Sequence, residues 1–297
     1  MLSGIGVSLA GRDLLRVSDL VPAEAEAIFD LAVELRASPR LPLLPGATLG
    51  LYFSKHSTRT RVSFSAGIAQ LGGVAIPLTP EELQISRGES LPDTARALSR
   101  YLDVLAVRTH EHAELEAWAE WASIPVINAL TADEHPCQAL ADALTIRDRL
   151  GSLEGVRVAW VGDGSNVLVS LAALGELLGY DVVAASPPGY EAAGVETVGE
   201  AREAVAGADV VVTDTWISMG QEHERDRRLR DLEPFRLDRD LLALAAPGAF
   251  VLHCLPAHPG EEATAEVLYG ERSAIWEEAE NRLHVQKALL ALLLGAR

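Results

Sequence analysis

The strongest constraint on the fold is an alternation along the chain of short, continuous apolar runs with longer segments of helical periodicity. A run in which every residue is apolar is typical of a parallel strand that is buried on both faces. Repeated strand–helix alternation predicts an α/β protein with parallel sheets. The expected strands are Thr48–Phe53, Val74–Leu78, Val104–Val107, Val126–Asn128, Val156–Val161, Val182–Ala185, Val210–Thr213 and Ala249–His253.

Two helices are placed by side-chain spacing and by their end signals. In Ser57–Leu71 the apolar residues Phe64 and Ile68 share one face, as expected of a helix packed on a core. In Pro136–Leu150 the proline occupies the first turn, where its missing N–H has no cost, and Gly151 follows the last residue. Both segments connect expected strands, which supports the α/β prediction.

Chain length favours two domains. The chain has 297 residues, and a domain has about 150 on average. The expected strands fall into two blocks of about four, so we predict two doubly wound domains with a break near Pro136–Leu150. The sequence shows no internal repeat and no low-complexity segment.

Composition narrows the class of protein. The net charge is −18, which argues against binding to nucleic acid or to an anionic membrane. Two cysteines are too few for a disulfide framework and fit a reducing compartment. No apolar run reaches the ~20 residues of a membrane span, and Met1–Arg16 lacks the pattern of a secretion signal. We therefore expect a cytoplasmic protein.

The segment Ser57–Arg61 is a candidate anion site. It reads Ser-Thr-Arg-Thr-Arg, follows an expected strand and opens an expected helix. Free backbone N–H groups and the helix dipole favour an anion there, and guanidinium groups match phosphate oxygens. The plainer interpretation is a capped helix with two surface arginines. The segment is not a Walker A loop, because it lacks the glycine-rich stretch before a lysine.

Two more polar residues follow expected strands and can join this site. Arg108 comes after Val104–Val107, and His135 comes after the strand that begins at Val126. Ligands of open parallel sheets bind beyond the carboxyl ends of the strands. Gln138 lies one helical turn after His135, so both side chains can face one ligand. Taken alone, His135 is also compatible with a helix cap or a core histidine.

The turn Val161–Val167 invites a dinucleotide-binding interpretation that its details do not support. The third glycine of the G-x-G-x-x-G pattern falls at Val167, and the next strand ends in Ala184-Ala185-Ser186 without an acidic residue for a ribose. The glycines are explained by a tight strand–helix turn. We expect no organic cofactor, and we find no His/Cys cluster with the spacing of a metal site.

Three further segments stand out near the C-terminal half. Cys254 ends the strand Ala249–His253, where a free cysteine is commonly a small buried apolar residue. A Cys/His hydrolase is disfavoured, because neighbouring residues of a strand point to opposite faces. Asp214 follows another strand and can be a turn residue or a ligand. The run Arg225–Arg228 is expected to be a solvated loop.

Four strings, in this order, resemble the signatures of the aspartate/ornithine carbamoyltransferase family. They are FSKHSTRTRVSF, HPCQALAD, HCLPAHPGEE and ENRLHVQKALL, and the last two are similar to the ornithine branch. The resemblance extends from about Leu20 to the C-terminus. One such string alone has modest specificity, whereas four in order are highly specific.

The resemblance implies an architecture and an assembly. Two doubly wound α/β domains are expected, with residues 1–133 binding carbamoyl phosphate and residues 134–278 binding ornithine. The last helix, 279–297, returns to the first domain in this family. Family members are homotrimers or multiples of trimers, and a loop equivalent to Gln84–Ser90 reaches a neighbouring subunit's site. No metal and no organic cofactor is expected to be required.

The resemblance also assigns roles to individual residues. The phosphate is expected to bind Ser57, Thr58, Arg59 and Thr60. The carbamoyl group is expected to bind the side chains of Arg108, His135, Gln138 and Arg282 and the main chain of Cys254 and Leu255. Ornithine is expected to bind Asn166, Asp214, Ser218 and Met219. The residues expected to act in catalysis are Arg108, His135, Asp214, Cys254 and Arg282.

The third string favours ornithine over aspartate as the acceptor. The aspartate branch carries a proline and an arginine where this chain has Cys254 and Ala257. The expected reaction transfers the carbamoyl group of carbamoyl phosphate to the side-chain amine of ornithine and gives citrulline and phosphate. Another amine acceptor, such as acetylornithine or putrescine, and a catalytically silent family member remain open as alternatives.

Overall fold

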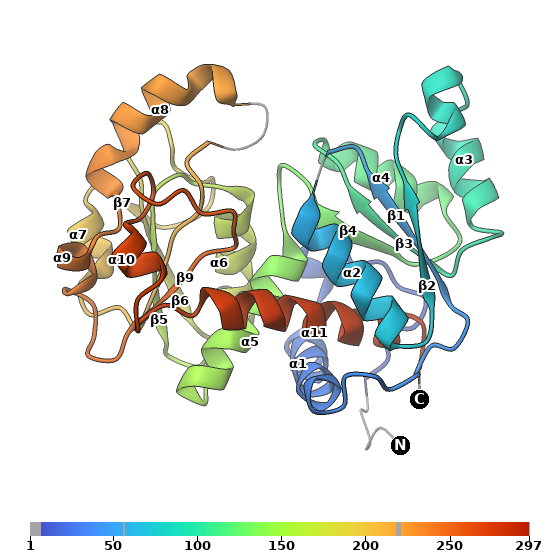
Figure 1. The fold of residues 1–297 in the computed structure, drawn as a ribbon, viewed down its shortest axis with the longest axis horizontal. Coiled ribbons are helices and arrows are strands. Elements are labelled where there is room, and N and C mark those ends of the chain that lie inside the picture. Colours follow the sequence, from blue (N-terminus) through green and yellow to red (C-terminus); the bar gives the residue numbers. More distant parts are fainter. Residues whose placement is uncertain (1–6, 56, 218–220, 297) are drawn as a thin grey trace. The chain divides into compact units, whose positions relative to one another are not determined.

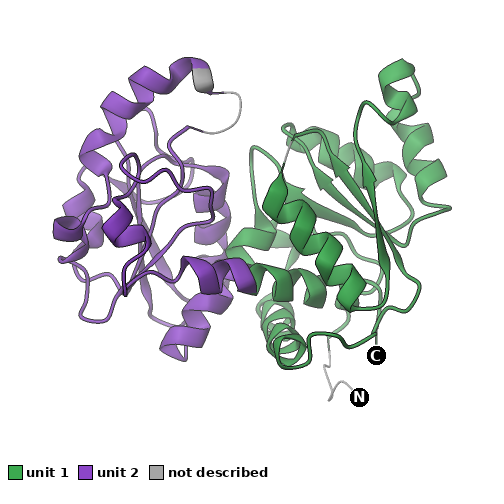
Figure 2. Cartoon of the chain, in the orientation of Figure 1, with its two compact units in different colours: residues 1–140, 281–297 green, residues 141–280 purple. Residues whose placement is uncertain are grey.

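The computed structural model describes residues 7–55, 57–217 and 221–296. The chain forms two compact units, Met1–Leu140 with Asn281–Arg297, and Ala141–Glu280 (Figures 1 and 2). It passes from unit 1 to unit 2 within helix α5 (Pro136–Leu150) and returns within α11 (Ile275–Leu293). The C-terminal helix therefore contributes its second part to unit 1, as the fold prediction required.

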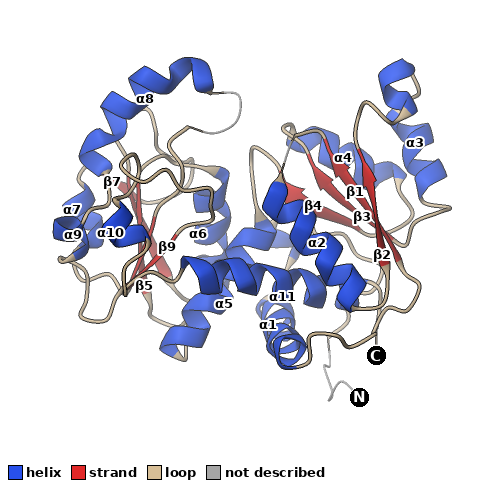
Figure 3. Cartoon of the chain, viewed as in Figure 1, coloured by secondary structure: helices blue, strands red, loops and turns tan. Residues whose placement is uncertain are grey.

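Unit 1 is built on a four-stranded parallel sheet (Figure 3). The strand order is β2-β1-β3-β4. At the carboxyl ends Phe53 of β1 lies opposite Arg108 of β3, and Arg108 lies opposite Leu130 of β4 after a register shift at Val107/Arg108. The strands are β1 (Thr48–Phe53), β2 (Val74–Leu78), β3 (Val104–Arg108) and β4 (Val126–Leu130). The other helical segments are η1 (Val17–Asp19), α1 (Pro22–Ala37), α2 (Thr58–Gln70), η2 (Gln84–Arg87), α3 (Leu91–Leu98) and α4 (His112–Trp121).

Apolar residues on both faces of the central strands hold unit 1 together. Every residue of Val104–Val107 is buried, as predicted for a parallel strand covered on two sides. Trp118 of α4 is fully buried, and the centroid of its ring lies 4.9 Å from the ring centroid of Tyr52. The edge strand β2 differs, because Val74 and Ile76 are exposed.

Unit 2 is built on a five-stranded parallel sheet with the order β7-β6-β5-β8-β9 (Figure 3). The strands are β5 (Arg157–Val161), β6 (Asp181–Ala185), β7 (Thr197–Val198), β8 (Val210–Val212) and β9 (Phe250–Leu252). Its helical segments besides α5 and α11 are α6 (Asn166–Leu178), α7 (Ala201–Val205), η3 (Glu222–Glu224), α8 (Arg225–Leu232), η4 (Glu233–Phe235), α9 (Arg239–Leu242) and α10 (Ala265–Leu268). Val161, Val211 and Val251 lie in one buried core with residues of α7, α9 and α10.

The predicted α/β class is confirmed, and each predicted strand forms within one or two residues of its expected bounds. One strand was missed. β7 has two residues, Thr197 and Val198, and pairs at the sheet edge with Ala184 and Ala185. Such a short edge pairing leaves no run of apolar residues, so its sequence carries no strand signal.

Each sheet has one strand from which the chain winds to both sides. β1 lies between β2 and β3, and β5 lies between β6 and β8. At such a strand, the connection from its carboxyl end runs to one side of the sheet and the connection from the neighbouring strand runs to the other side. This divergence opens a crevice at the carboxyl edge of a doubly wound sheet. The topology therefore predicts a ligand site after β1, β3 and β4 in unit 1, and another after β5, β8 and β9 in unit 2.

No helix among the described residues is both long enough and apolar enough to cross a membrane.

The turn from β5 to α6 depends on a glycine at position 164. The Gly164 N–H donates to the Tyr190 carbonyl at 2.7 Å. A Cβ atom at Gly164 would lie 2.6 Å from the Tyr190 carbonyl oxygen and would also overlap the Ala192 backbone nitrogen. This turn brings two backbone segments too close for any side chain.

We predict that Gly164→Ala lowers the free energy of unfolding by roughly 1–3 kcal/mol, the usual range for inserting a methyl group into a packed site. Urea unfolding would measure it. The matched control is Gly199→Ala, because a Cβ atom at Gly199 meets nothing within 4 Å. Equal stability of the two variants would contradict the close approach.

Candidate active site

Helix α2 presents a free N-terminus after β1. Its N-cap is Ser57, whose backbone is extended and whose side-chain oxygen accepts a hydrogen bond from the Thr60 N–H at 3.3 Å. The first turn contains Thr58, Arg59 and Thr60 and no acidic residue. Backbone N–H groups, hydroxyls and the helix dipole together favour an anion at this position.

A buried polar cluster lies at the same end of unit 1. Arg282 of α11 is 6% exposed and donates from Nη1 to the side-chain oxygen of Gln138 at 2.8 Å. Its Nη2 contacts Nε2 of His135 at 3.1 Å and donates to the Thr60 hydroxyl. Arg108 donates to the same Thr60 hydroxyl at 3.4 Å. Thus five predicted site residues from four parts of the chain meet in one cluster.

His135 is held as a neutral imidazole. Burial, followed by the nearby charges of Arg282 and Arg108, holds the pKa of His135 well below its usual value of 6.5. An arginine can only donate, so Nε2 of His135 accepts from Arg282 and the ring proton resides on Nδ1. A neutral ring with a proton on Nδ1 can donate to a ligand oxygen without adding charge to the cluster.

A second polar group gathers at the carboxyl edge of the unit 2 sheet. The Asp214 carboxylate is 7% exposed and accepts from the Cys254 thiol at 3.1 Å and from the Ser165 hydroxyl at 3.3 Å. The Thr215 N–H donates to it at 2.7 Å. Asn166 is the first residue of α6 and directly follows Ser165, the N-cap of that helix. The structure therefore places Asn166, Asp214 and Cys254 at the ends of three adjacent strands.

Cys254 is a hydrogen-bond donor in this group. Burial raises the pKa of the Cys254 thiol well above its usual value, and the negative charge of Asp214 raises it further. The thiol therefore stays protonated at neutral pH and donates to Asp214. A thiolate nucleophile or base is excluded by this environment.

The backbone after Cys254 is fixed by a buried histidine and glutamate. Leu255 has a left-handed conformation, φ 60°, which is costly for a residue with a side chain. Its N–H donates to Nδ1 of His253 at 2.9 Å, so Nε2 carries the ring proton and donates to Glu262 at 3.1 Å. His253 and Glu262 are both fully buried. This pair stabilises the turn that carries Cys254 and Leu255.

The prediction of a solvated loop at Arg225–Arg228 is confirmed for the exposure of the first three residues, but it was wrong about the loop and about Arg228. These residues open helix α8, and Arg228 is 5% exposed. Its guanidinium forms an ion pair with Asp163 and donates from Nε to the Trp216 carbonyl at 2.6 Å. Burial raises the pKa of Asp163 to about 6, with Arg228 acting in the opposite direction. One arginine of the charge run thus connects the β5–α6 turn to the segment after β8.

Among the residues that the structure describes, two groups of side chains have the composition of a metal site, although their spacing in the sequence did not indicate one. In both groups the donor atoms lie within 4.8 Å of one another. The imidazole of His253 already uses both nitrogens, for Leu255 and Glu262, so a metal ion at the first group would have to displace one of these hydrogen bonds. The groups are Asp214, His253 and Cys254, and His258, Glu261 and Glu262.

The segment after β8, which is predicted to bind ornithine, is only partly described by the structure. Ser218, Met219 and Gly220 lie outside the described residues. The sequence reasoning also missed Ser165, Asp163 and Glu262. Ser165 carries a recognisable N-cap signal before α6, whereas the partners of Asp163 and Glu262 come from distant parts of the chain and leave no local pattern.

Comparison with known proteins gives a consistent picture. Residues 12–148 match the family model described as the carbamoyl-P binding domain of aspartate/ornithine carbamoyltransferase, and residues 154–293 match the Asp/Orn binding domain of the same description. An ornithine carbamoyltransferase of Nostoc sp. is 51% identical, over 97% of this chain and 99% of the relative. One of Carboxydothermus hydrogenoformans is 49% identical, with the same coverage.

Solved structures agree with the sequence relatives. The ornithine carbamoyltransferase of Pyrococcus furiosus superposes with a TM-score of 0.94 at 45% identity, covering 98% of this chain and 99% of that one. The enzyme of Thermus thermophilus has a TM-score of 0.89 at 41% identity, with coverage of 95% and 98%.

We predict that Cys254 resists alkylation despite its partial exposure. At pH 8, iodoacetamide should label it at least roughly 100-fold more slowly than a free cysteine, because the thiolate is the reactive form. Asp214→Asn should accelerate labelling, since the negative charge that raises the thiol pKa is removed. Peptide mass spectrometry separates Cys254 from the buried Cys137. Labelling of wild-type Cys254 at the rate of a free thiol would contradict this environment.

Proposed function

The chain belongs to the aspartate/ornithine carbamoyltransferase family, and from this premise we propose that it transfers the carbamoyl group of carbamoyl phosphate to the side-chain amine of L-ornithine, giving L-citrulline and phosphate. The observation that carries the proposal is the buried cluster of Arg282, Thr60, Gln138 and His135 at the N-terminus of α2. It combines a site for an anion with hydrogen-bond donors for a carbonyl oxygen, and an acyl phosphate contains both of these groups.

The phosphate of carbamoyl phosphate would bind at the start of α2. The proposed ligands are the backbone and side chains of Ser57, Thr58, Arg59 and Thr60. A phosphate accepts hydrogen bonds from several donors at once, and an absence of acidic residues in the first turn leaves the helix dipole unopposed. The guanidinium of Arg59 would add a charge-assisted bond.

The carbonyl oxygen of the carbamoyl group would be polarised by Arg108, His135 and Arg282. Negative charge develops on this oxygen as the amine attacks, and fixed donors stabilise it most in the transition state. Gln138 would accept from the carbamoyl NH₂ through its side-chain oxygen, which has two lone pairs and uses one for Arg282. The predicted main-chain acceptors at Cys254 and Leu255 stay a prediction.

Ornithine would be recognised by residues of unit 2. Asn166 would donate to its carboxylate, and Asp214 would accept from its α-ammonium group. Ser218 and Met219 remain predicted parts of this site. Cys254 would act by donating its thiol hydrogen bond to Asp214, which orients that carboxylate. The absence of an arginine at Ala257 fits an acceptor without a side-chain carboxylate.

The attacking amine must lose its proton before it reacts. A free alkylamine has a pKa of about 10.4, so only a small fraction is neutral at pH 7. Because Cys254 stays protonated, it does not serve as the proton acceptor in this proposal. After attack, the tetrahedral intermediate would collapse with cleavage of the carbon–oxygen bond to phosphate, which leaves with the bonding electron pair. The extra proton of the attacking nitrogen would pass to the departing phosphate.

We also propose a homotrimer, or a multiple of trimers, working in the cytoplasm. Unit 1 exposes the apolar side chains of Val62, Val74 and Ile76 around α2 and the edge strand β2, and exposed apolar patches commonly mark interfaces. The predicted neighbour-reaching loop around Gln84–Ser90 forms the exposed η2 turn before α3. Light scattering should return a multiple of three times the 31.7 kDa chain mass, whereas a monomer would contradict this assembly.

The activity is tested by scoring carbamoyl transfer from carbamoyl phosphate to ornithine, with aspartate, acetylornithine and putrescine in parallel. We expect product with ornithine alone. Product with a different amine would retain the carbamoyl phosphate site and contradict the proposed acceptor site. An absence of product with every amine, together with intact binding of a phosphonate analogue, would indicate a catalytically silent member.

We predict that Arg108→Leu lowers kcat by at least roughly 10²-fold, the usual loss when one donor to a developing oxyanion is removed. Circular dichroism should show an unchanged fold, because Arg108 lies at a strand end. Arg100→Leu provides the control, since Arg100 is exposed and precedes the amino end of β3, whereas Arg108 is the last residue of that strand. Activity of the Arg108 variant within a few fold of wild type would rule out its role.

A further inference from the structure

The segment around Leu14 runs along β4 in unit 1. The Leu14 N–H donates to the Val126 carbonyl at 2.9 Å, and the Asn128 N–H donates to the Leu14 carbonyl at 2.8 Å. The Asn128 side chain also donates to the Leu15 carbonyl at 2.8 Å. An N-terminal segment is therefore bound to the strand that leads directly to His135.

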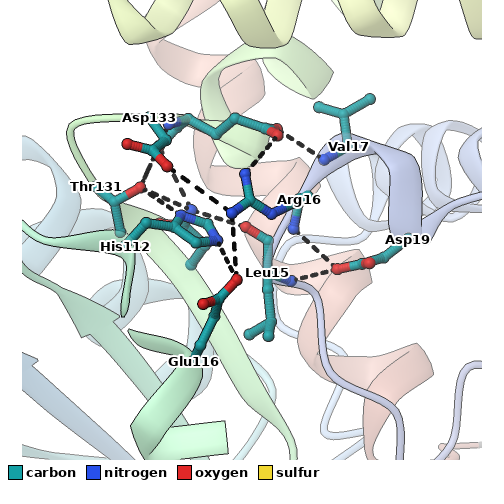
Figure 4. Close-up of polar contacts among 10 residues, drawn as sticks. Leu15, Arg16, Val17, Asp19, His112, Glu116, Thr131 and Asp133 are labelled. Atoms are coloured by element: carbon teal, nitrogen blue, oxygen red, sulfur yellow. Dashed lines mark hydrogen bonds and ion pairs between the residues drawn. The ribbon is translucent and has the colours of Figure 1, made fainter. Parts of the chain in front are cut away.

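The turn between β4 and α5 closes on itself and on α4. The Thr131 N–H donates to the Glu134 carbonyl at 3.0 Å, and the Glu134 N–H donates to the Thr131 hydroxyl at 3.3 Å. The same hydroxyl lies 2.9 Å from Nδ1 of His112, a buried residue of α4 (Figure 4). Thr131 thus fixes the start of the turn.

Glu134 fixes the end of this turn. Its carboxylate is nearly buried, at 7% exposure, and Oε2 accepts from the Val17 N–H at 2.8 Å. Oε1 lies 3.8 Å from the Arg16 guanidinium, which also approaches Glu116 at 3.2 Å and Asp133 at 3.8 Å (Figure 4). The exposed ion pairs are weak, so the buried bond to Val17 holds the turn more firmly than they do.

We propose that Glu134 is a positioning residue for His135: by binding the Val17 N–H, its carboxylate holds the turn in the place from which the next residue reaches Arg282. The inference rests on the proposed function, because it assigns His135 to the carbamoyl oxygen. Glu134 itself touches no reacting atom in this account. It acts through the backbone that it shares with His135.

The ionisation of His135 reports on this positioning. The charged groups that face its ring are Arg282 from α11 and Arg108 from β3, and the buried Cys137 thiol of α5 lies in the same environment. Burial and the two arginines keep the ring neutral. If Glu134 no longer holds the turn, the His135 ring can become exposed to water and move away from the two arginines. The pKa of His135 then rises toward its usual value of 6.5. The protonated ring cannot accept from Arg282, so activity falls on the acid side.

The experiment compares Glu134→Ala, Glu134→Gln and Glu134→Asp in the full-length protein. Alanine removes the acceptor, glutamine retains an acceptor oxygen for Val17, and aspartate retains the charge but is one methylene too short. We expect alanine to lower kcat roughly 10- to 100-fold, the effect of a small misplacement of a catalytic group. The KM for carbamoyl phosphate and the inhibition constant for inorganic phosphate should change by less than about threefold. Aspartate should fall between alanine and wild type, and glutamine should stay within about threefold of wild type.

The second readout is the titration of His135, followed by NMR of protein with labelled histidine and assigned with His135→Gln. We expect a midpoint well below 6.5 in wild type and in Glu134→Gln, and a midpoint near 6.5 in Glu134→Ala. A new acid limb in kcat should accompany the shift. Glu120→Ala, an exposed acidic residue of α4, is the matched control and should leave both readouts unchanged.

Three outcomes would overturn the proposal. The first is a Glu134→Ala variant with wild-type kcat and wild-type titration of His135. The second is a Glu134→Gln variant that is as impaired as Glu134→Ala. The third is a Glu134→Ala variant that loses kcat and phosphate affinity to the same extent, with an unchanged titration of His135. The proposed function and the role of Glu134 can be tested separately. A wild-type protein that makes no citrulline would contradict the proposed function, whereas the titration tests the role of Glu134 without any turnover.

Discussion

The arrangement of unit 1 depends on the burial of one guanidinium group. Arg282 is 6% exposed, and burying a charge is costly unless hydrogen bonds compensate for the lost water. Its partners are Thr60 at the start of α2, Gln138 in the first turn of α5 and His135 just before it. These partners come from the first half of the chain and lie in unit 1, so the last helix must reach unit 1 for Arg282 to contact them. Burial, together with the charges of Arg282 and Arg108, lowers the pKa of His135 and keeps the ring neutral. The bonds of Arg282 hold the donors in place for a carbonyl oxygen.

Topology brings the remaining groups to the right edge of each sheet. In unit 1 the polar residues follow β1, β3 and β4, and in unit 2 they follow β5, β8 and β9. Parallel strands in register end at one edge, so side chains that are far apart in sequence become neighbours there. Unit 1 collects arginines and a helix N-terminus, which suits an acyl phosphate. Unit 2 collects Asp214, an amide at Asn166 and a protonated thiol at Cys254, which suits an amino acid.

Much of this could be predicted from the sequence, because the signals are local. Continuous apolar runs marked the buried strands, and Ser57 and Pro136 marked two helix starts. The motifs identified the residues that meet around Arg282. The predictions that were wrong or missing involve partners from distant segments. The charge run predicted a solvated loop, whereas Arg228 is buried in an ion pair with Asp163. Glu262 and Glu134 likewise acquire their roles from His253 and Val17, and no spacing in the sequence indicates these contacts.

If the residues around Arg282 in unit 1 form the principal carbamoyl phosphate site, the protein should bind carbamoyl phosphate without the second substrate. Isothermal titration with a phosphonate analogue, in which a methylene group replaces the bridging oxygen, measures this directly. We expect binding in the absence of ornithine and at least roughly tenfold weaker binding by Arg282→Met. A tenfold loss corresponds to about 1.4 kcal/mol, close to the lower end of the range for one charged hydrogen bond. Binding that requires ornithine, or that is unchanged in the Arg282 variant, would contradict this expectation.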